Sequence, residues 1–302
     1  MAGANVLNYE RRFQLAAYVE LTKPITWFPP MWAFACGIVS SGHSVTDSPV
    51  LVLLGVCLTG PLVCGASQII NDWCDRHVDA INQPERPIPS GRVSSRNAFY
   101  FAILWSLLGL VVGFAISFVV GCATLLGLVL AYAYSAQPFR LKLNGWWGNA
   151  AVGFSYEGLA WVTGAALLAS GSVPHPEVLL VAVLYSVGAH GIMTLNDFKA
   201  IEGDIQMGIR SLPVMLGPER AALVAGFVMF AAQAGVIAYL WTAEFRLHGL
   251  LVGGLLLAQM AAFNRFRRSP EQLAPWYNGT GVTCYVVGMM VTATAIGSAV
   301  GG

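Results

Sequence analysis

Residues 50–79, VLVLLGVCLTGPLVCGASQIINDWCDRHVD, pass from a charge-free apolar run into a dense acidic motif. The apolar part, 50–70, has the length of about twenty residues that a helix needs to cross the hydrocarbon core of a bilayer. The acidic part places Asp72, Asp75 and Asp79 directly after that run. A membrane helix that ends in carboxylates predicts a polar functional site at the rim of the bilayer.

The composition of the whole chain also indicates a membrane protein. Of 302 residues, 56% are AVILMFWYC and only 10% are charged, whereas about 25% of the residues in a soluble domain are charged. The net charge of +1 excludes the strongly basic surface of a nucleic-acid-binding protein. The six cysteines are scattered and show neither a disulfide framework nor metal-ligand spacing.

Apolar stretches of span length recur along the chain, and they predict an all-α integral membrane protein with a single domain, 1–302. The pair Pro29-Pro30 falls inside the first stretch and predicts a kink. The third and fourth stretches are predicted to form a tight hairpin near Gly121. The nine expected spans run over about 25–42, 50–70, 98–118, 120–135, 148–169, 178–195, 221–240, 248–264 and 280–299.

The cationic residues predict the orientation of these spans. All Lys and Arg residues except Arg246 fall on one side of the predicted spans. Because cytoplasmic loops carry an excess of Lys and Arg, that side is expected to be cytosolic. The N-terminal segment 1–24 is therefore expected in the cytosol, together with two acidic loops at about 71–97 and 196–220.

The two acidic loops repeat each other. Residues 71–79 and 196–204 both begin with Asn-Asp and both end with Asp. Each is followed by Arg, any residue, Ile or Leu, and Pro, at 86–89 and 210–213. An even number of expected spans separates the copies, so they share one orientation. This pattern predicts a parallel internal repeat whose paired sites face each other.

The acidic residues of the repeat predict a metal site. If the second span continues as a helix, Asn71, Asp75 and Asp79 lie on one narrow stripe, and Asp197 and Asp204 likewise share a face. Like charges one turn apart repel, so a cation is expected to compensate them. A few carboxylates that leave room for substrate phosphate oxygens suit Mg²⁺. The expected catalytic and metal-binding residues are Asn71, Asp72, Asp75, Asp79, Asp197 and Asp204.

Basic residues near these acids predict a clamp for a diphosphate. Two Mg²⁺ ions and several cations facing an apolar membrane interior fit the transfer of a prenyl chain from its diphosphate, since they stabilise charge as the C–O bond breaks. The alternative is that the carboxylates are solvated and merely paired with Arg76, Arg86 and Lys199. The expected clamp residues are Lys23, Arg86, Arg140, Lys142, Lys199 and Arg210.

Three stretches resemble a known family. NDWCDRHVDAINQPERPIPSGR, from Asn71, is similar to the NxxxDxxxD signature of the UbiA-type intramembrane prenyltransferases, and nine spans match that helical bundle. YSAQPFRLKLNGWWGN, from Tyr134, and NDFKAIEGDIQMGIRSLP, from Asn196, resemble the chlorophyll synthase branch, most closely its bacteriochlorophyll synthases. One departure concerns Ala200, where the family commonly has Asp; Asp197 or Glu202 is expected to substitute for it.

The resemblance implies a reaction, its substrates and its location. A geranylgeranyl or phytyl group would pass from its diphosphate to the ring-D propionate of bacteriochlorophyllide a, or, as the alternative, of chlorophyllide. An acceptor carboxylate is ionised at neutral pH, so no catalytic base and no His or Ser nucleophile are expected. The implied setting is the bacterial cytoplasmic (inner or intracytoplasmic) membrane, with the active site open to the cytosol and with association with other pigment-biosynthesis or photosystem-assembly proteins left open.

Four residues are candidates for contact with the acceptor. Glu157 is an acid inside an expected span, which marks either a functional site or a hydrogen-bonded structural residue. Tyr134 and Tyr156 offer aromatic contacts, although tyrosines at span ends also anchor helices at the interface. His190 would bind the chelated Mg of the pigment or a neighbouring helix. Two rival functions remain open, namely a secondary transporter, whose charges should lie near the midplane, and a non-catalytic pigment-binding protein.

Overall fold

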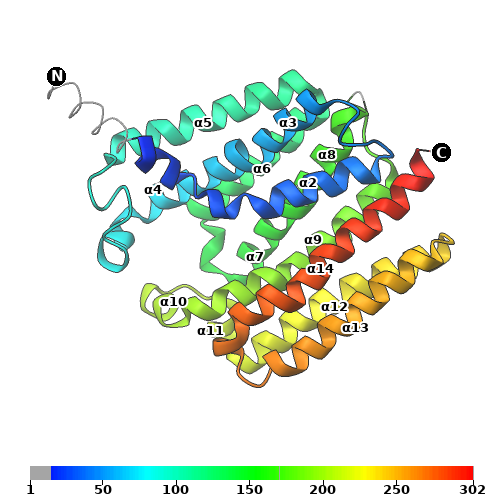
Figure 1. Ribbon diagram of the computed structural model, residues 1–302. Helices are drawn as coiled ribbons and strands as arrows, with labels where there is room; N and C mark the ends of the chain where they lie inside the picture. The colour runs from blue at the N-terminus through cyan, green and yellow to red at the C-terminus, as the bar shows by residue number, and fades with distance from the viewer. Residues whose placement is uncertain (1–14, 170, 302) are drawn as a thin grey trace, which may run out of the picture.

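The computed structural model describes residues 15–169 and 171–301, and the regular elements among them are helical (Figure 1). Residues 15–21 form a first helix. The other elements are, in chain order, η1 (Pro24–Thr26), α2 (Phe28–Ser40), α3 (Pro49–Cys57), η2 (Leu58–Cys64), α4 (Gly65–Asn82), α5 (Ser95–Ile116), α6 (Phe118–Ser135), η3 (Leu141–Leu143), α7 (Gly145–Gly153), η4 (Phe154–Leu159), α8 (Ala160–Leu168), α9 (Pro176–Asp197), η5 (Phe198–Ala200), α10 (Ile201–Met207), α11 (Leu212–Leu216), α12 (Pro218–Thr242), α13 (Arg246–Phe266) and α14 (Pro270–Val300).

The all-α prediction is confirmed. Seven helical runs among the described residues are long and apolar enough to cross a membrane. The expected spans at 25–42 and 148–169 fall instead on the shorter α2 and on the run from α7 through η4 to α8. The count of nine spans and the cytosolic N-terminal segment stay predictions, and residues 1–14 of that segment lie outside the described part of the chain.

One local prediction is wrong, and a second, the tight hairpin, is confirmed but misplaced by a few residues. Pro29 and Pro30 do not kink a span, because they lie in the first turn of α2, where backbone N–H groups have no intrahelical acceptor to lose. The hairpin between α5 and α6 turns at Ser117 and not near Gly121. Ser117 is extended, with φ −168° and ψ 164°, and its Oγ accepts a hydrogen bond of 3.2 Å from Val120 N. A serine cap therefore starts α6 directly after α5 ends.

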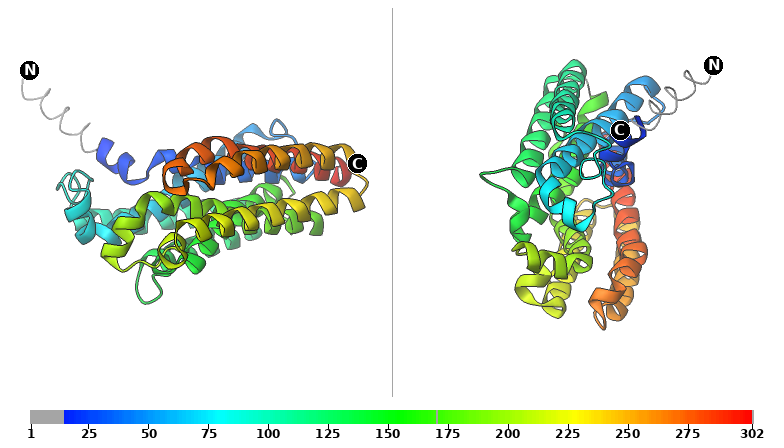
Figure 2. Two further views of the ribbon diagram at one scale, coloured as in Figure 1. Left: turned by 90° about the horizontal axis from the view of Figure 1, so that it is seen from below. Right: turned by 90° about the vertical axis from the view of Figure 1, so that its left-hand side faces the viewer.

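The long helices lie roughly alongside one another (Figures 1 and 2). α2 packs on α8 and α14, and α9 packs on α12 and α14. α5 and α6 pack together on one flank, and α12 and α13 pack together on the other. The far end of α4 and the short helices α10 and α11 lie at the same end of the bundle, on the left in Figure 1. This end carries both acidic motifs.

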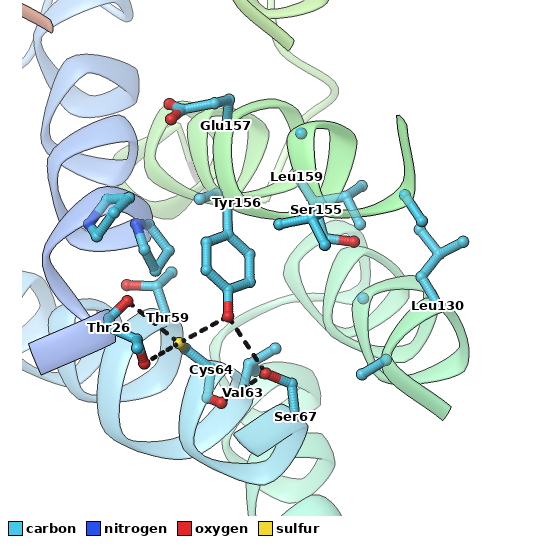
Figure 3. A pocket seen from close by; sticks show the side chains of 18 of the residues that line it. Thr26, Thr59, Val63, Cys64, Ser67, Leu130, Ser155, Tyr156, Glu157 and Leu159 are labelled. Atoms are coloured by element: carbon cyan, nitrogen blue, oxygen red, sulfur yellow. Dashed lines mark hydrogen bonds between the residues drawn. The ribbon is translucent and has the colours of Figure 1, made fainter. Parts of the chain in front are cut away.

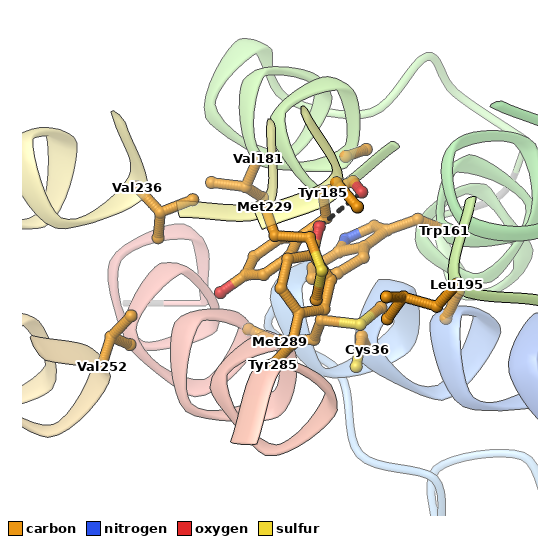
Figure 4. Close-up of a cluster of buried hydrophobic side chains, with 14 of the residues drawn as sticks. Cys36, Trp161, Val181, Tyr185, Leu195, Met229, Val236, Val252, Tyr285 and Met289 are labelled. Carbon is orange, nitrogen blue, oxygen red and sulfur yellow. Dashed lines mark hydrogen bonds between the residues drawn. The ribbon is translucent and has the colours of Figure 1, made fainter. Parts of the chain in front are cut away.

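Aromatic side chains join four helices in the centre of the bundle (Figure 4). Trp161 stacks on Tyr185, and its Nε1 donates a hydrogen bond of 2.9 Å to Ser40 Oγ. The hydroxyls of Tyr185 and Thr292 are 2.7 Å apart, and Tyr285 Oη donates to the backbone oxygen of Tyr185 at 2.6 Å. Every polar tip in this group thus has a partner, as burial in an apolar interior requires. The core therefore holds α2, α8, α9 and α14 rigidly beside the site.

Glycines allow α2 and α8 to cross closely, and we expect Gly164→Ala to destabilise the protein. An added Cβ would lie 2.0 Å from Phe34 O at Gly164, and 2.1 Å from Trp161 O at Gly37. Because small residues let helix backbones approach in membranes, the methyl group should force the helices apart and cost about 1–3 kcal/mol. Thermal unfolding in detergent measures this loss. Gly254→Ala is the control, since no atom lies within 4 Å of its added Cβ; equal midpoints would contradict the close crossing.

Candidate active site at the rim of the bundle

The first acidic motif lies on a helix. α4 continues through the expected end of the second span as far as Asn82, so the start of the predicted loop 71–97 is helical. The helix ends shortly before Pro84, because proline disfavours helical backbone in the residue that precedes it. The continuation that would place Asn71, Asp75 and Asp79 on one stripe is therefore present.

Cations contact two of the carboxylates of this motif. Lys23 Nζ lies 2.6 Å from Asp72 Oδ1. Arg86 Nη1 lies 2.7 Å from Asp79 Oδ2 and 3.3 Å from Asp72 Oδ1. Asp72 and Asp79 are both buried, so these ion pairs are poorly screened by water. Under the alternative interpretation the carboxylates pair with basic residues, and Arg86 does so. The same ion pairs hold two expected clamp residues, Lys23 and Arg86, at the motif.

The third carboxylate is held by the segment between α6 and α7. Lys142 donates to both carboxylate oxygens of Asp75, and Arg140 Nη2 lies 3.4 Å from Asp75 Oδ1. Asn71, one turn away, donates from Nδ2 to Ser135 Oγ at the end of α6 at 3.4 Å. Two further expected clamp residues, Arg140 and Lys142, are therefore brought to the first motif.

The second motif begins at the end of α9. Asp197 Oδ2 accepts a hydrogen bond of 3.1 Å from Asn149 Nδ2 on α7, and Asp204 is buried on α10. The prediction that Asp197 and Asp204 share a face assumed one continuous α-helix. That assumption is wrong, because the tighter 3₁₀ turn η5 separates α9 from α10. Glu202 is exposed to solvent, beside Ala200. Burial therefore favours Asp197 over Glu202 as the partner of Asp204.

The two motifs reach one cavity of about 360 Å³ through their first residues. Their first residues, Asn71 and Asn196, both line it. The segment that carries Lys142 also pairs with the second motif, since Gly145 N donates to Arg210 O at 2.8 Å and Arg210 N donates to Leu143 O at 2.9 Å. One segment thus contacts the first motif and the loop that follows the second motif.

Tyrosines line the cavity next to the motifs. Tyr134 is near enough to Asp75, Asp197 and Asp204 for their charges to act on its hydroxyl. Tyr134 therefore lies between the two copies of the repeat. From α6 it connects the acidic end of the cavity to the apolar walls.

A polar cluster on η2 and α4 orients the second tyrosine of the cavity (Figure 3). Tyr156 Oη accepts a hydrogen bond of 2.9 Å from Gln68 Nε2, and Cys64 Sγ and Ser67 Oγ lie 3.3 and 3.4 Å from it. Nothing in the sequence alone marks Gln68, Ser67 or Cys64 as site residues. The only available signal was a set of polar residues at the end of an otherwise apolar span, next to the acidic motif.

Widened π-helical turns form two walls of the cavity. η2 interrupts the run from α3 to α4, and η4 interrupts the run from α7 to α8. Such turns insert an extra residue into the helix and occur frequently at functional sites. On η4 the neighbouring residues Tyr156 and Glu157 point to different sides of the helix (Figure 3), and both line the cavity.

Of the expected site residues, Asn71, Tyr134, Tyr156 and Glu157 line the cavity, whereas the carboxylates of the motifs, the clamp cations and His190 do not. His190 Nε2 lies 3.2 Å from Trp146 O, and its Nδ1 is buried without a hydrogen-bond partner. His190 is not among the residues that line the cavity, so the geometry favours the helix-packing alternative over a pigment ligand. Lys199 is exposed at the rim and takes part in none of the ion pairs of the described residues.

The donor atoms of the two motifs fit Mg²⁺. Carboxylate and amide oxygens are the hard ligands that this ion prefers, and it commonly takes one or two carboxylates together with substrate phosphates and water. Within residues 15–169 and 171–301, no group of three or more His, Cys, Asp or Glu side chains forms a ready-made metal cage. The site therefore fits ions that are completed by substrate oxygens better than a closed structural metal centre.

Comparisons with known proteins identify the family of the chain. Residues 28–292 match the model of the UbiA prenyltransferase family. The chain is 55% identical to the bacteriochlorophyll synthase 33 kDa chain of Rhodobacter capsulatus, over 93% of each chain. It is 37% identical to the chloroplastic chlorophyll synthase of Oryza sativa, over 92% of this chain and 76% of the relative.

A solved structure shares the fold. It is that of a UbiA homologue from Archaeoglobus fulgidus bound to GPP and Mg²⁺. The two structures superpose with a TM-score of 0.69 at 20% sequence identity, over 91% of this chain and 99% of that chain. The match of the family model over most of the chain, together with these relatives, shows that this chain belongs to the UbiA prenyltransferase family.

Proposed function

We propose that this protein transfers a geranylgeranyl or phytyl group from its diphosphate to the propionate carboxylate of bacteriochlorophyllide a, in a Mg²⁺-dependent reaction. The observation that carries the proposal is that the first residues of both acidic motifs line one largely apolar cavity, while cations pair with the carboxylates that follow on α4. The relatives that are 55% identical are named bacteriochlorophyll synthases, whereas the chlorophyll synthases are 37% identical. Bacteriochlorophyllide is therefore favoured over chlorophyllide.

The residues at the rim would bind and activate the donor diphosphate. When bound, Mg²⁺ neutralises the charge that develops on the leaving diphosphate. Asp75 and Asp79 would hold one ion, and Asp197 and Asp204 the other, with Asn71 supplying an amide oxygen. The clamp cations contribute positive charge at the same place. They would be Lys23, Arg86, Arg140, Lys142, Lys199 and Arg210.

The transfer itself needs little further chemistry from the protein. The C–O bond between the allylic carbon and the diphosphate breaks, and its electron pair leaves with the diphosphate. An oxygen of the ionised propionate then forms the ester bond to that carbon, so no base has to remove a proton. The apolar walls of the cavity hold the prenyl chain and exclude water, which would otherwise capture the allylic carbon.

The same geometry argues against the two rival functions. A secondary transporter should bind its substrate near the middle of the membrane, whereas the paired acidic motifs here lie at one end of the bundle. A non-catalytic pigment-binding protein has no use for two repeated acidic motifs with cations beside them. We further propose that this end of the bundle faces the cytosol, in the bacterial cytoplasmic membrane.

Removing a clamp cation should weaken donor binding. We expect Arg86→Ala and Lys199→Ala each to raise the KM for the prenyl diphosphate about tenfold, because each removes one charge contact to the diphosphate. Steady-state kinetics with varied donor measures this effect. Arg246→Ala is the matched control, since Arg246 lies at the other end of the bundle and pairs with Glu244. An unchanged KM in both clamp variants would show that the clamp is wrongly placed.

A turnover assay on purified protein tests the proposed function. The acceptors are bacteriochlorophyllide a, chlorophyllide a and an aromatic acid, with geranylgeranyl or phytyl diphosphate as donor and with Mg²⁺ or EDTA. We expect an esterified bacteriochlorin that forms only with Mg²⁺. Transfer to the aromatic acid alone would overturn the choice of acceptor. Pigment binding without any transfer would support the non-catalytic alternative.

A further inference from the structure

An unpaired acid lines the cavity away from the two motifs. Glu157 on η4 is only 6% exposed, and its Oε2 is buried without a hydrogen-bond partner. None of the ion pairs of the described residues involves it. The mechanism described above also does not use it. An unsatisfied buried polar atom is rare in native proteins and calls for an explanation, of which a bound ligand is one.

The surroundings of Glu157 favour a neutral carboxyl group. Burying an isolated carboxylate in an apolar environment is far more costly than burying a neutral acid. Pro29, Pro30 and Ala160 line the cavity together with Glu157, and none of them carries a positive charge. A neutral carboxyl has one hydroxyl donor. Rotation about its terminal bond exchanges the two oxygens at little cost, so this donor can face the cavity.

The chemistry of the two substrates identifies the partner of that donor. A prenyl chain is a hydrocarbon and offers no hydrogen-bond acceptor. The macrocycle of bacteriochlorophyllide carries conjugated carbonyl groups on its rim, which are acceptors. On the basis of the proposed function, we propose that Glu157 donates a hydrogen bond to a rim carbonyl of the bound macrocycle and so positions and selects the acceptor.

Glu157 and its neighbour Tyr156 point to different sides of η4 and differ in their partners (Figure 3). Tyr156 points toward η2 and α4, where Cys64, Ser67 and Gln68 already satisfy its hydroxyl (Figure 3). Glu157 leaves the other side of the π-helical turn and has no such partner. Tyr156 thus serves as a fixed wall, and Glu157 is the group of this pair that remains free to bind a ligand.

Pigment binding without donor tests the proposal. Glu157→Leu has a similar volume and lacks the donor, and an apolar residue here is expected to leave the fold intact. We expect it to raise the Kd for bacteriochlorophyllide a roughly tenfold, the loss typical of one buried hydrogen bond. Glu157→Gln keeps an N–H donor and should stay within about threefold of the unsubstituted protein. Glu177→Gln, at an exposed acid at the start of α9, is the matched control.

Resonance Raman spectra of the bound pigment would not differ between the variants if Glu157 had only a structural role. A hydrogen bond lowers the stretching frequency of a conjugated carbonyl, so this band should move to higher frequency in Glu157→Leu and return toward its original position in Glu157→Gln. Thermal unfolding of both variants, compared with the unsubstituted protein, checks that they are folded.

The outcomes separate this inference from the proposed function. If the unsubstituted protein turns over and Glu157→Leu changes neither the Kd for the pigment nor the carbonyl band, the inference alone is overturned. The same holds if Glu157→Leu loses turnover while pigment binding is unchanged. If the unsubstituted protein binds no bacteriochlorophyllide, the proposed function fails, and the inference fails with it.

Discussion

Asp75→Asn and Asp79→Asn should each lower kcat by roughly a hundredfold or more, with the fold preserved. Both carboxylates lie on α4, one and two turns beyond the cavity-lining Asn71, and they are proposed to hold Mg²⁺ against the diphosphate. An amide keeps the size of the side chain and removes its negative charge, so the ion is bound more weakly and stabilises the leaving group less. Arg86 retains its contact with Asp72 when Asp79 is replaced, so the local structure keeps an ion pair.

Single-turnover and steady-state assays over a range of Mg²⁺ concentrations measure this effect. Asp47→Asn is the control, because Asp47 is the one aspartate of the chain outside the two motifs, and it should leave kcat unchanged. Thermal unfolding of the variants checks that they are folded. Full activity of either α4 variant at high Mg²⁺ would count against its assignment as a ligand.

The second motif should show the other large effect. We expect Asp204→Asn to lower kcat roughly a hundredfold and Asp197→Asn to have a similar effect, because both are proposed to bind the second ion. Glu202→Gln is the matched control two residues away, and it should change kcat less than threefold because Glu202 points to solvent. The same steady-state assay, with Mg²⁺ varied, compares the three variants.

This comparison also decides which residue replaces the acid that the family commonly has at Ala200. A loss in Glu202→Gln as large as that in Asp204→Asn would show that α10 rearranges when the donor binds. A loss in Asp197→Asn and Asp204→Asn alone supports the ligand pair that burial favours. Activity in all three variants would contradict a second metal site.

The helices could be predicted from the sequence because a membrane imposes a minimum length and excludes charge. The exact ends of the helices were less predictable, because they depend on single residues and not on hydropathy. The break at Ser117 depends on a single serine cap between two apolar helices, and hydropathy does not detect it. Pro29 and Pro30 lie inside an apolar stretch in the sequence, and only the structure shows that the helix begins beside them.

The candidate site was predictable where charge is rare and repeated. The acidic motifs and most of their cations were found because such residues are costly in a membrane protein and recur at equal spacing. The π-helical turns were not predictable, since they depend on packing between distant helices. The polar partners of Tyr156 are ordinary residues such as Ser67 and Gln68, whose role follows only from their contacts.

Retention of labelled oxygen tests the central claim most directly. Bacteriochlorophyllide a labelled with ¹⁸O in both oxygens of its propionate is incubated with purified protein, geranylgeranyl diphosphate and Mg²⁺, and the product is analysed by mass spectrometry. Attack of the carboxylate on the prenyl carbon predicts an ester that retains both labelled oxygens. An ester that has lost one labelled oxygen would mean that the carboxyl carbon was activated instead, and no ester at all would contradict the proposed reaction.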